Sequence, residues 1–154
     1  MYGAEVYLIP TPAPHFLPEL SAIPADVLRR AKTLVVNYPN NPTGATCDRA
    51  WLARCVEFAR AHGLLLISDL AYSELTYAPD AAPSIFEIPG ARDVAVELHS
   101  CSKSFNMAGL RIGFAVGRAD AMEALLAYRA NVGYGTPWAA QAAGATALAN
   151  ASAL

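Results

Sequence analysis

Asp69 and Tyr72 form the first group of side chains with chemical potential. Asp69 directly follows the apolar run 64–68, and Tyr72 lies one helical turn further along the chain. A carboxylate in apolar surroundings needs a cationic partner or several hydrogen-bond donors. We interpret Asp69 either as a cap of the following turn or as the counter-ion of a cationic ligand ring, with the Tyr72 hydroxyl directed at the same place.

A second group is formed by two serines, a lysine and an arginine. Ser100, Ser102 and Lys103 follow an apolar run, and Arg111 comes shortly after them. Hydroxyls and a guanidinium suit a phosphate group, and lysine readily supplies a neutral amine nucleophile. The chain has nine arginines but only two lysines, which makes Lys103 more informative than a lysine usually is. The alternative is a solvated lysine in a turn.

Asn41 belongs to a third segment, Tyr38-Pro-Asn-Asn-Pro-Thr-Gly44, which is dense in turn-forming residues. Its prolines stiffen the loop, which would hold the Asn41 amide rigidly against a ligand. Capping of the turn is the alternative. His99 is expected to pack or to support the site from behind, and Glu97 to lie at the surface or behind the site. The histidines show no Ser-His-Asp arrangement and no metal-ligand spacing.

Short apolar runs alternate with amphipathic stretches along the chain. The pattern predicts strands over residues 4–9, 33–37, 64–68, 94–99 and 111–116. It predicts helices over 26–30, 46–62, 122–131 and 137–148, the second of them with Thr46 as its N-cap. The expected fold class is α/β, a mainly parallel sheet with helices on both faces. Such sheets bind ligands at the carboxyl ends of their strands, which is where the three polar segments lie.

Composition limits the classes of function. Hydrophobic residues make up 55% of the 154 residues and charged residues 16%, which excludes a disordered chain. The net charge of −2 without a basic stripe argues against a nucleic-acid partner. No apolar run is long enough to span a membrane, and no signal peptide is recognisable, so a cytoplasmic location is expected. Three cysteines without a paired spacing favour a reducing compartment, with Cys55 a buried apolar residue.

The three polar segments occur in an order and at a spacing that resemble the class I/II aminotransferases of the fold type I pyridoxal-phosphate family. The resembling motifs are Tyr38–Gly44, Ser68-Asp69 with Tyr72, and Ser100-x-Ser-Lys103 with Arg111. The match covers nearly the whole chain. Residues 97–111 most resemble the LL-diaminopimelate, alanine and aspartate-type branch.

This resemblance implies a role for each candidate residue. Lys103 would form a Schiff base with pyridoxal 5′-phosphate, and Asp69 would pair with the pyridine nitrogen of that cofactor. Asn41 and Tyr72 would hydrogen-bond the 3-oxygen of its ring. The phosphate would be held by Ser100, Ser102 and Arg111. The implied reaction is transamination between a small-molecule amino acid and a 2-oxo acid.

The resemblance also implies that residues 1–154 are a partial large domain. Family members carry an upstream segment with a glycine-rich phosphate loop and a downstream small domain, and neither is recognisable here. The full-length parent is expected to be a homodimer, and the chain alone is expected to bind the cofactor weakly and to turn over little. Three alternatives stay open: a C–S β-lyase on the same scaffold, a ligand-sensing domain of a transcription regulator, and an inactive fragment.

Overall fold

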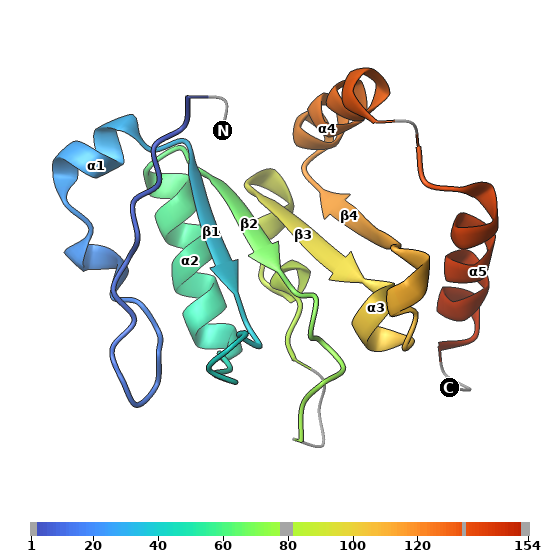
Figure 1. Cartoon of the computed structure of the whole chain (residues 1–154). Helices are drawn as coiled ribbons and strands as arrows, with labels where there is room; N and C mark the ends of the chain where they lie inside the picture. Colours follow the sequence, from blue (N-terminus) through green and yellow to red (C-terminus); the bar gives the residue numbers. More distant parts are fainter. Residues whose placement is uncertain (1–2, 78–81, 134, 152–154) are drawn as a thin grey trace.

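The computed structural model describes residues 3–77, 82–133 and 135–151 of the chain. Its centre is a four-stranded sheet in the order β1-β2-β3-β4 (Figure 1). The strands are β1 (Thr33–Asn37), β2 (Leu65–Asp69), β3 (Ala95–Ser100) and β4 (Gly113–Gly117). The first three run parallel, and β4 pairs antiparallel with β3. The predicted α/β fold with a mainly parallel sheet is therefore confirmed.

Helices connect these strands and flank the sheet. They are α1 (Ala25–Arg30), α2 (Arg49–Ala61), α3 (Cys101–Ser104), α4 (Ala119–Val132) and α5 (Trp138–Ala149). Single 3-10 turns are η1 (Leu20–Ala22), η2 (Ile85–Glu87), η3 (Ala91–Asp93) and η4 (Ala108–Leu110). Figure 1 places α1 and α2 beside the β1 end of the sheet, and α4 and α5 beside the β4 end.

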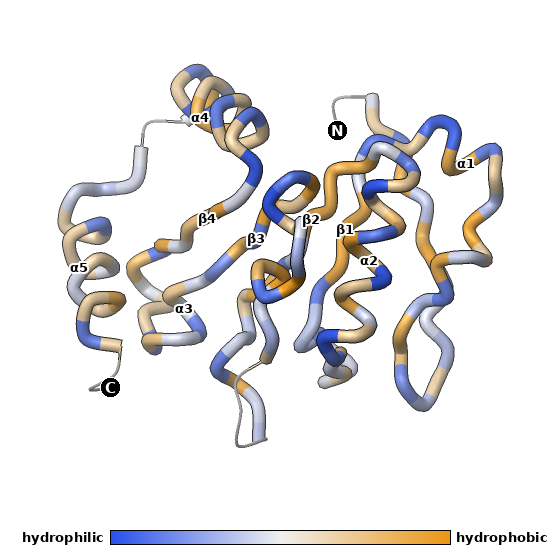
Figure 2. The backbone as a smooth tube through the Cα atoms, turned by 180° about the vertical axis from the view of Figure 1, so that it is seen from behind, coloured by the Kyte–Doolittle hydropathy of each residue, from blue (hydrophilic) through white to orange (hydrophobic). Residues whose placement is uncertain are grey.

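The core lies between the sheet and α2. Leu34 and Val36 of β1 and Leu66 of β2 are buried, whereas Val35, on the opposite face of β1, is 61% exposed. This alternation follows from the two-residue repeat of side chains along a strand. The facing stripe of α2 consists of Trp51, Leu52, Cys55, Val56 and Ala59, which confirms the predicted burial of Cys55. Figure 2 shows the matching change between hydrophilic and hydrophobic residues along the turns of α2.

Residues 4–9 do not form the predicted strand. They pair with no strand of the sheet, and Val6 and Leu8 are 67% and 82% exposed. Glu5 of this segment forms an exposed ion pair with Arg30. The alternating pattern alone did not determine the structure, because a strand forms only where a neighbour supplies hydrogen-bond partners.

The helix predicted from Thr46 also begins later than expected. Its N-cap is Asp48, whose carboxylate accepts a hydrogen bond of 2.7 Å from the backbone N–H of Trp51. A carboxylate caps as well as a hydroxyl does, and its charge also suits the positive end of the helix. The helix ends at Ala61, close to the predicted end. The prediction for the last strand was wrong at its start, because Arg111 adopts a left-handed conformation before β4 begins.

Candidate active site

The polar residues that follow the parallel strands meet at one edge of the sheet. Asn37, the last residue of β1, lies beside Asp69, the last residue of β2, and Asp69 lies beside Leu98 of β3. Ser100 ends β3 and pairs with Gly113, so the segment that contains Arg111 enters β4 at the same edge. The predicted gathering of polar groups at the carboxyl ends of the strands is thus what the structure shows.

The turn after β1 is held by two asparagines that precede Asn41. The Asn37 side chain donates to the carbonyl of Asp69 (2.9 Å), and its oxygen accepts from the backbone N–H of Asn41 (3.4 Å). The Asn40 oxygen accepts from the hydroxyl and the backbone N–H of Thr43 (2.7 and 3.3 Å). These bonds fix the backbone on both sides of Asn41, whose side chain is left exposed.

Asn41, Tyr72 and Lys103 come together from three separate segments. The Asn41 amide donates a hydrogen bond of 3.0 Å to the Tyr72 hydroxyl. The Lys103 ammonium nitrogen lies 5.6 Å from the centre of the Tyr72 ring, within the range of a cation–π contact. Tyr72 thus links the amide after β1 with the amine after β3.

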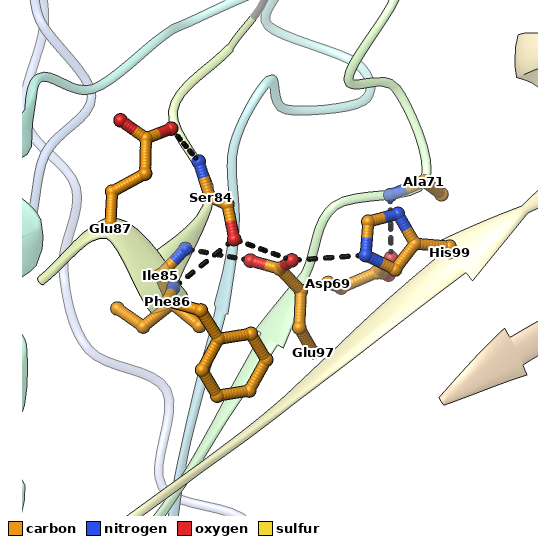
Figure 3. A network of polar contacts seen from close by, with 8 residues as sticks. All are labelled: Asp69, Ala71, Ser84, Ile85, Phe86, Glu87, Glu97 and His99. Carbon is orange, nitrogen blue, oxygen red and sulfur yellow. Dashed lines mark hydrogen bonds and ion pairs between the residues drawn. The ribbon is translucent and has the colours of Figure 1, made fainter. Parts of the chain in front are cut away.

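Asp69 lies half-buried at the end of β2. One of its carboxylate oxygens accepts from the backbone N–H of Ala71 at 3.2 Å, which is the turn-capping contact considered from the sequence (Figure 3). A carboxylate has further lone pairs, so this single contact leaves it able to accept from a ligand.

Ser100, Ser102 and Arg111 lie around the β3–α3 turn and the start of β4. Ser100 occupies the N-cap position of α3 without making a side-chain cap bond, and Ser102 is half-buried within α3. Arg111 is exposed, has a positive φ of 51°, and donates to the carbonyl of Ala108 at 2.9 Å. The structure thus places the two serines and the arginine at one edge, although the Arg111 bond is directed to its own loop.

Two residues that matter here were not assigned a role from the sequence. Asn37 positions Asn41, and its position as a polar residue at the end of an apolar strand was the available signal. For Glu97 the expectation left open the surface or a place behind the site, and its 1% exposure and its hydrogen bonds exclude the surface. A lone charge inside the apolar run 94–98 was the signal for this second residue.

Burial changes the acidity of three groups around the turn. It raises the pKa of the Tyr38 phenol and of the Cys47 and Cys55 thiols, each to about 12. The Tyr38 ring contacts Trp51 edge-on at a centroid distance of 5.0 Å, and its hydroxyl donates to the carbonyl of Phe16. The Tyr38 side chain therefore connects the turn with α2 and with the segment around Phe16.

A cavity of about 870 Å³ opens between the turn and the segment after β2. Asn41 and Tyr72 line it, together with the apolar residues Pro42, Leu75 and Pro83. Within the described ranges, no group of three histidine, cysteine, aspartate or glutamate side chains could hold a metal ion. No helix among the described residues is both long and apolar enough to cross a membrane.

Comparison with known protein families assigns the chain to one of them. The family model for "Aminotransferase class I and II" matches residues 1–153. The chain belongs to this aminotransferase family. Enzymes of this family depend on pyridoxal 5′-phosphate, and the resemblance expected from the sequence motifs is confirmed.

Relatives of this aminotransferase chain cover most of its length. The LL-diaminopimelate aminotransferase of Moorella thermoacetica is 50% identical over 95% of the chain, and that of Syntrophobacter fumaroxidans is 46% identical over 95%. The chain spans 38% of the length of both relatives. The apo structure of BacF from Bacillus subtilis superposes with a TM-score of 0.88 at 38% identity, covering 94% of this chain and 39% of BacF.

The donor set of the site fits the family cofactor. The half-buried carboxylate of Asp69 suits a protonated ring nitrogen, and the adjacent Asn41 and Tyr72 groups suit a ring oxygen. Serine hydroxyls and the Arg111 guanidinium suit a phosphate. All of these groups lie at the carboxyl edge of the sheet, where α/β proteins bind ligands.

Proposed function

We propose that residues 1–154 are the cofactor-binding part of the large domain of an aminotransferase that exchanges an amino group between an amino acid and a 2-oxo acid. The observation that supports this most directly is the contact of Asn41, Tyr72 and Lys103, which come from three segments of the chain. An amide, a phenol and an amine that meet at the carboxyl edge of a parallel sheet suit a ring ligand with an adjacent reactive carbon.

In this proposal each residue binds one part of pyridoxal 5′-phosphate. Lys103 holds the cofactor through a Schiff-base linkage, and Asp69 pairs with its ring nitrogen. Asn41 and Tyr72 bind the ring oxygen, and their 3.0 Å hydrogen bond holds both groups at one place. The phosphate is held by Ser100, Ser102 and Arg111.

The chemistry of the chain's own residues follows from these roles. When bound, pyridoxal phosphate supplies an electron sink for the electrons left at the substrate α-carbon. The Asp69 carboxylate keeps a proton on the ring nitrogen, because a nearby negative charge favours the protonated form. Once the amino group of the substrate has displaced it from the cofactor, the freed Lys103 amine would remove the α-carbon proton as a general base and return a proton as a general acid.

The names of the relatives suggest the substrate to test first. Both curated relatives described above are LL-diaminopimelate aminotransferases, so LL-diaminopimelate is the first amino donor to assay. The homodimer and the cytoplasmic location expected from the sequence belong to the same proposal. Sedimentation of the full-length parent and cell fractionation test these two parts.

A titration of the purified 154-residue chain with pyridoxal phosphate tests the cofactor site. We expect a visible absorbance band and, after borohydride reduction, an adduct that peptide mass analysis locates at Lys103. The chain's other lysine, Lys32, provides a matched control. Lys103→Arg should abolish the band, and Lys32→Arg should leave it unchanged. Adducts distributed over Lys32 and the N-terminus would count against the proposal.

Turnover is expected to be low for the 154-residue chain, which spans 38% of the length of its relatives. Substrate positioning contributes a large part of enzymatic rate, and much of the relatives' length lies outside this chain. Assays with LL-diaminopimelate and a series of 2-oxo acids measure transamination, and release of pyruvate and sulfide from cystathionine measures β-lyase activity. Rapid turnover by the chain alone would contradict the expectation.

A further inference from the structure

Glu97 is a buried carboxylate in the middle of β3. It is 1% exposed and accepts hydrogen bonds from the Ser84 hydroxyl (2.9 Å) and the Ile85 backbone N–H (2.7 Å), as Figure 3 shows. The third partner is Nε2 of His99 at 2.9 Å. With Glu97 ionised, Nε2 of His99 is the donor of this bond, because an ionised carboxylate only accepts.

His99 is held from a second side by Phe114. The two rings stack with centroids 4.7 Å apart and an interplanar angle of 11°. They are cross-strand partners in the β3–β4 register, which is the position where side-chain pairs contribute most to a sheet. Glu97, His99 and Phe114 together form what we call the β3 clamp.

The β3 clamp lies next to the serines and the arginine assigned to the phosphate. His99 directly precedes Ser100, and Phe114 follows the segment that contains Arg111. The strands stay paired beyond the clamp, because the backbone N–H of Cys101 donates to the carbonyl of Ile112 at 3.2 Å. Since neighbouring side chains of a strand point to opposite faces, His99 and Ser100 face opposite ways. The clamp therefore acts through the backbone rather than by touching a ligand.

We infer that Glu97 and His99 are positioning residues that keep Ser100 and Ser102 at a fixed separation from Arg111, and so set the affinity of the site for a phosphate group. The inference rests on the proposed function, since it assumes that these three residues hold the cofactor's phosphate. Its observable consequence is selective. Loss of the clamp weakens binding of a ligand that carries the phosphate and leaves binding of the same ring without it nearly unchanged.

Pyridoxal phosphate and pyridoxal are the two probes. We expect His99→Ala to raise the Kd for pyridoxal phosphate about tenfold, the change that accompanies loss of one charge-assisted hydrogen bond. The Kd for pyridoxal should change by less than about twofold. His62→Ala is the matched control, because His62 also contacts a phenylalanine ring, Phe58 at 4.4 Å, but on α2 and away from the site. It should change neither Kd.

Glu97→Gln provides a milder second variant together with a spectroscopic readout. Side-chain nitrogen NMR of the chain's three histidines should show Nε2 of His99 protonated in the unsubstituted chain. In Glu97→Gln the amide can donate to Nε2, so the proton of a neutral His99 should move to Nδ1. The pyridoxal phosphate Kd should rise while the pyridoxal Kd stays unchanged. A purely structural role of Glu97 would not produce this combination.

The outcomes separate the two proposals. If the unsubstituted 154-residue chain binds neither pyridoxal phosphate nor pyridoxal at Lys103, the proposed function fails, and the role of the clamp fails with it. If the unsubstituted chain binds both probes, but the substitutions weaken the binding of both equally or of neither, the cofactor site stands and the inference is overturned. Protonation of His99 at Nδ1 alone in the unsubstituted chain would also overturn the inference, because Nε2 could not then donate to Glu97.

Discussion

At the scale of single residues, Asn41 shows that a site residue depends on neighbours that have no proposed contact with the cofactor. Its side chain meets Tyr72, but its backbone is placed by Asn37, which also bonds the carbonyl of Asp69. One amide therefore connects two of the strand ends that supply the proposed cofactor ligands. The sequence motif identifies Asn41, whereas only the structure identifies Asn37 as the residue that positions it.

Replacing Asn37 with alanine tests this dependence. The substitution removes the bond to the Asp69 carbonyl and the bonds that the Asn37 oxygen accepts from the Asn41 N–H and the Asn40 amide. We expect the free energy of unfolding to fall by about 1–3 kcal/mol, measured by urea denaturation, and pyridoxal phosphate to bind more weakly. Asn131→Ala is the control, because the Asn131 side chain donates to the Ala127 carbonyl within exposed α4. Equal effects of the two substitutions would contradict the assigned role.

Single elements show where the sequence was sufficient and where it was not. The strand over 33–37 was predicted to the residue, since its β-branched run ends at a dense turn signal. Helix α2 was predicted with the wrong cap, because Thr46 and Asp48 are both good caps and only the path of the chain decides between them. The predicted strand over 4–9 failed because strand formation depends on a neighbour that local pattern does not reveal.

The orientation of β4 was a further feature that the sequence did not provide. Apolar runs predict strands but not the direction in which they run. The same run can pair parallel or antiparallel with its neighbour, depending on the connection that precedes it. In the structure β4 approaches β3 very closely. A Cβ at Gly113 would lie 2.5 Å from the backbone oxygen of His99. Glycine at this position is therefore a packing requirement of the β3–β4 pair.

Gly113→Ala should separate these strands. The clash is with backbone, which cannot rotate away, so we expect a loss of about 1–3 kcal/mol in the free energy of unfolding. Gly109→Ala is the matched control, since nothing lies within 4 Å of a Cβ built there. Thermal and urea unfolding of both variants measure the difference. A stable Gly113→Ala chain with unchanged cofactor affinity would show that the close approach is not required.

At the scale of the whole molecule, three acids with raised pKa values make stability depend on alkaline pH: the buried Cys55 thiol, and the half-buried Cys47 thiol and Tyr38 phenol. Burial raises the pKa of Cys47 and Cys55 from 9.0 to about 12, and that of Tyr38 from 10.0 to about 12. The unfolded chain therefore loses these protons at lower pH than the folded chain does. The contribution to stability is complete below about pH 9 and is lost as the pH rises toward about 12.

Urea denaturation at pH values from about 7 to about 11 measures this dependence. We expect the midpoint to be steady up to about pH 9 and to fall above it. Cys55→Ala removes one of the three groups and should make the fall shallower, although it also shortens a buried side chain. A midpoint that stays level to about pH 11 would contradict the raised pKa values of these three groups.

The antiparallel return of β4 also bears on the order in which the site is assembled. The end of β3 and the short connection to β4 contain Ser100, Lys103 and Arg111, so these residues are close together in sequence. Asn41 and Asp69 reach the same edge only after long crossovers between parallel strands. Loop closure costs more entropy as the loop lengthens, and local contacts form faster. We therefore expect the proposed phosphate ligands to become structured ahead of Asn41 and Asp69 during folding.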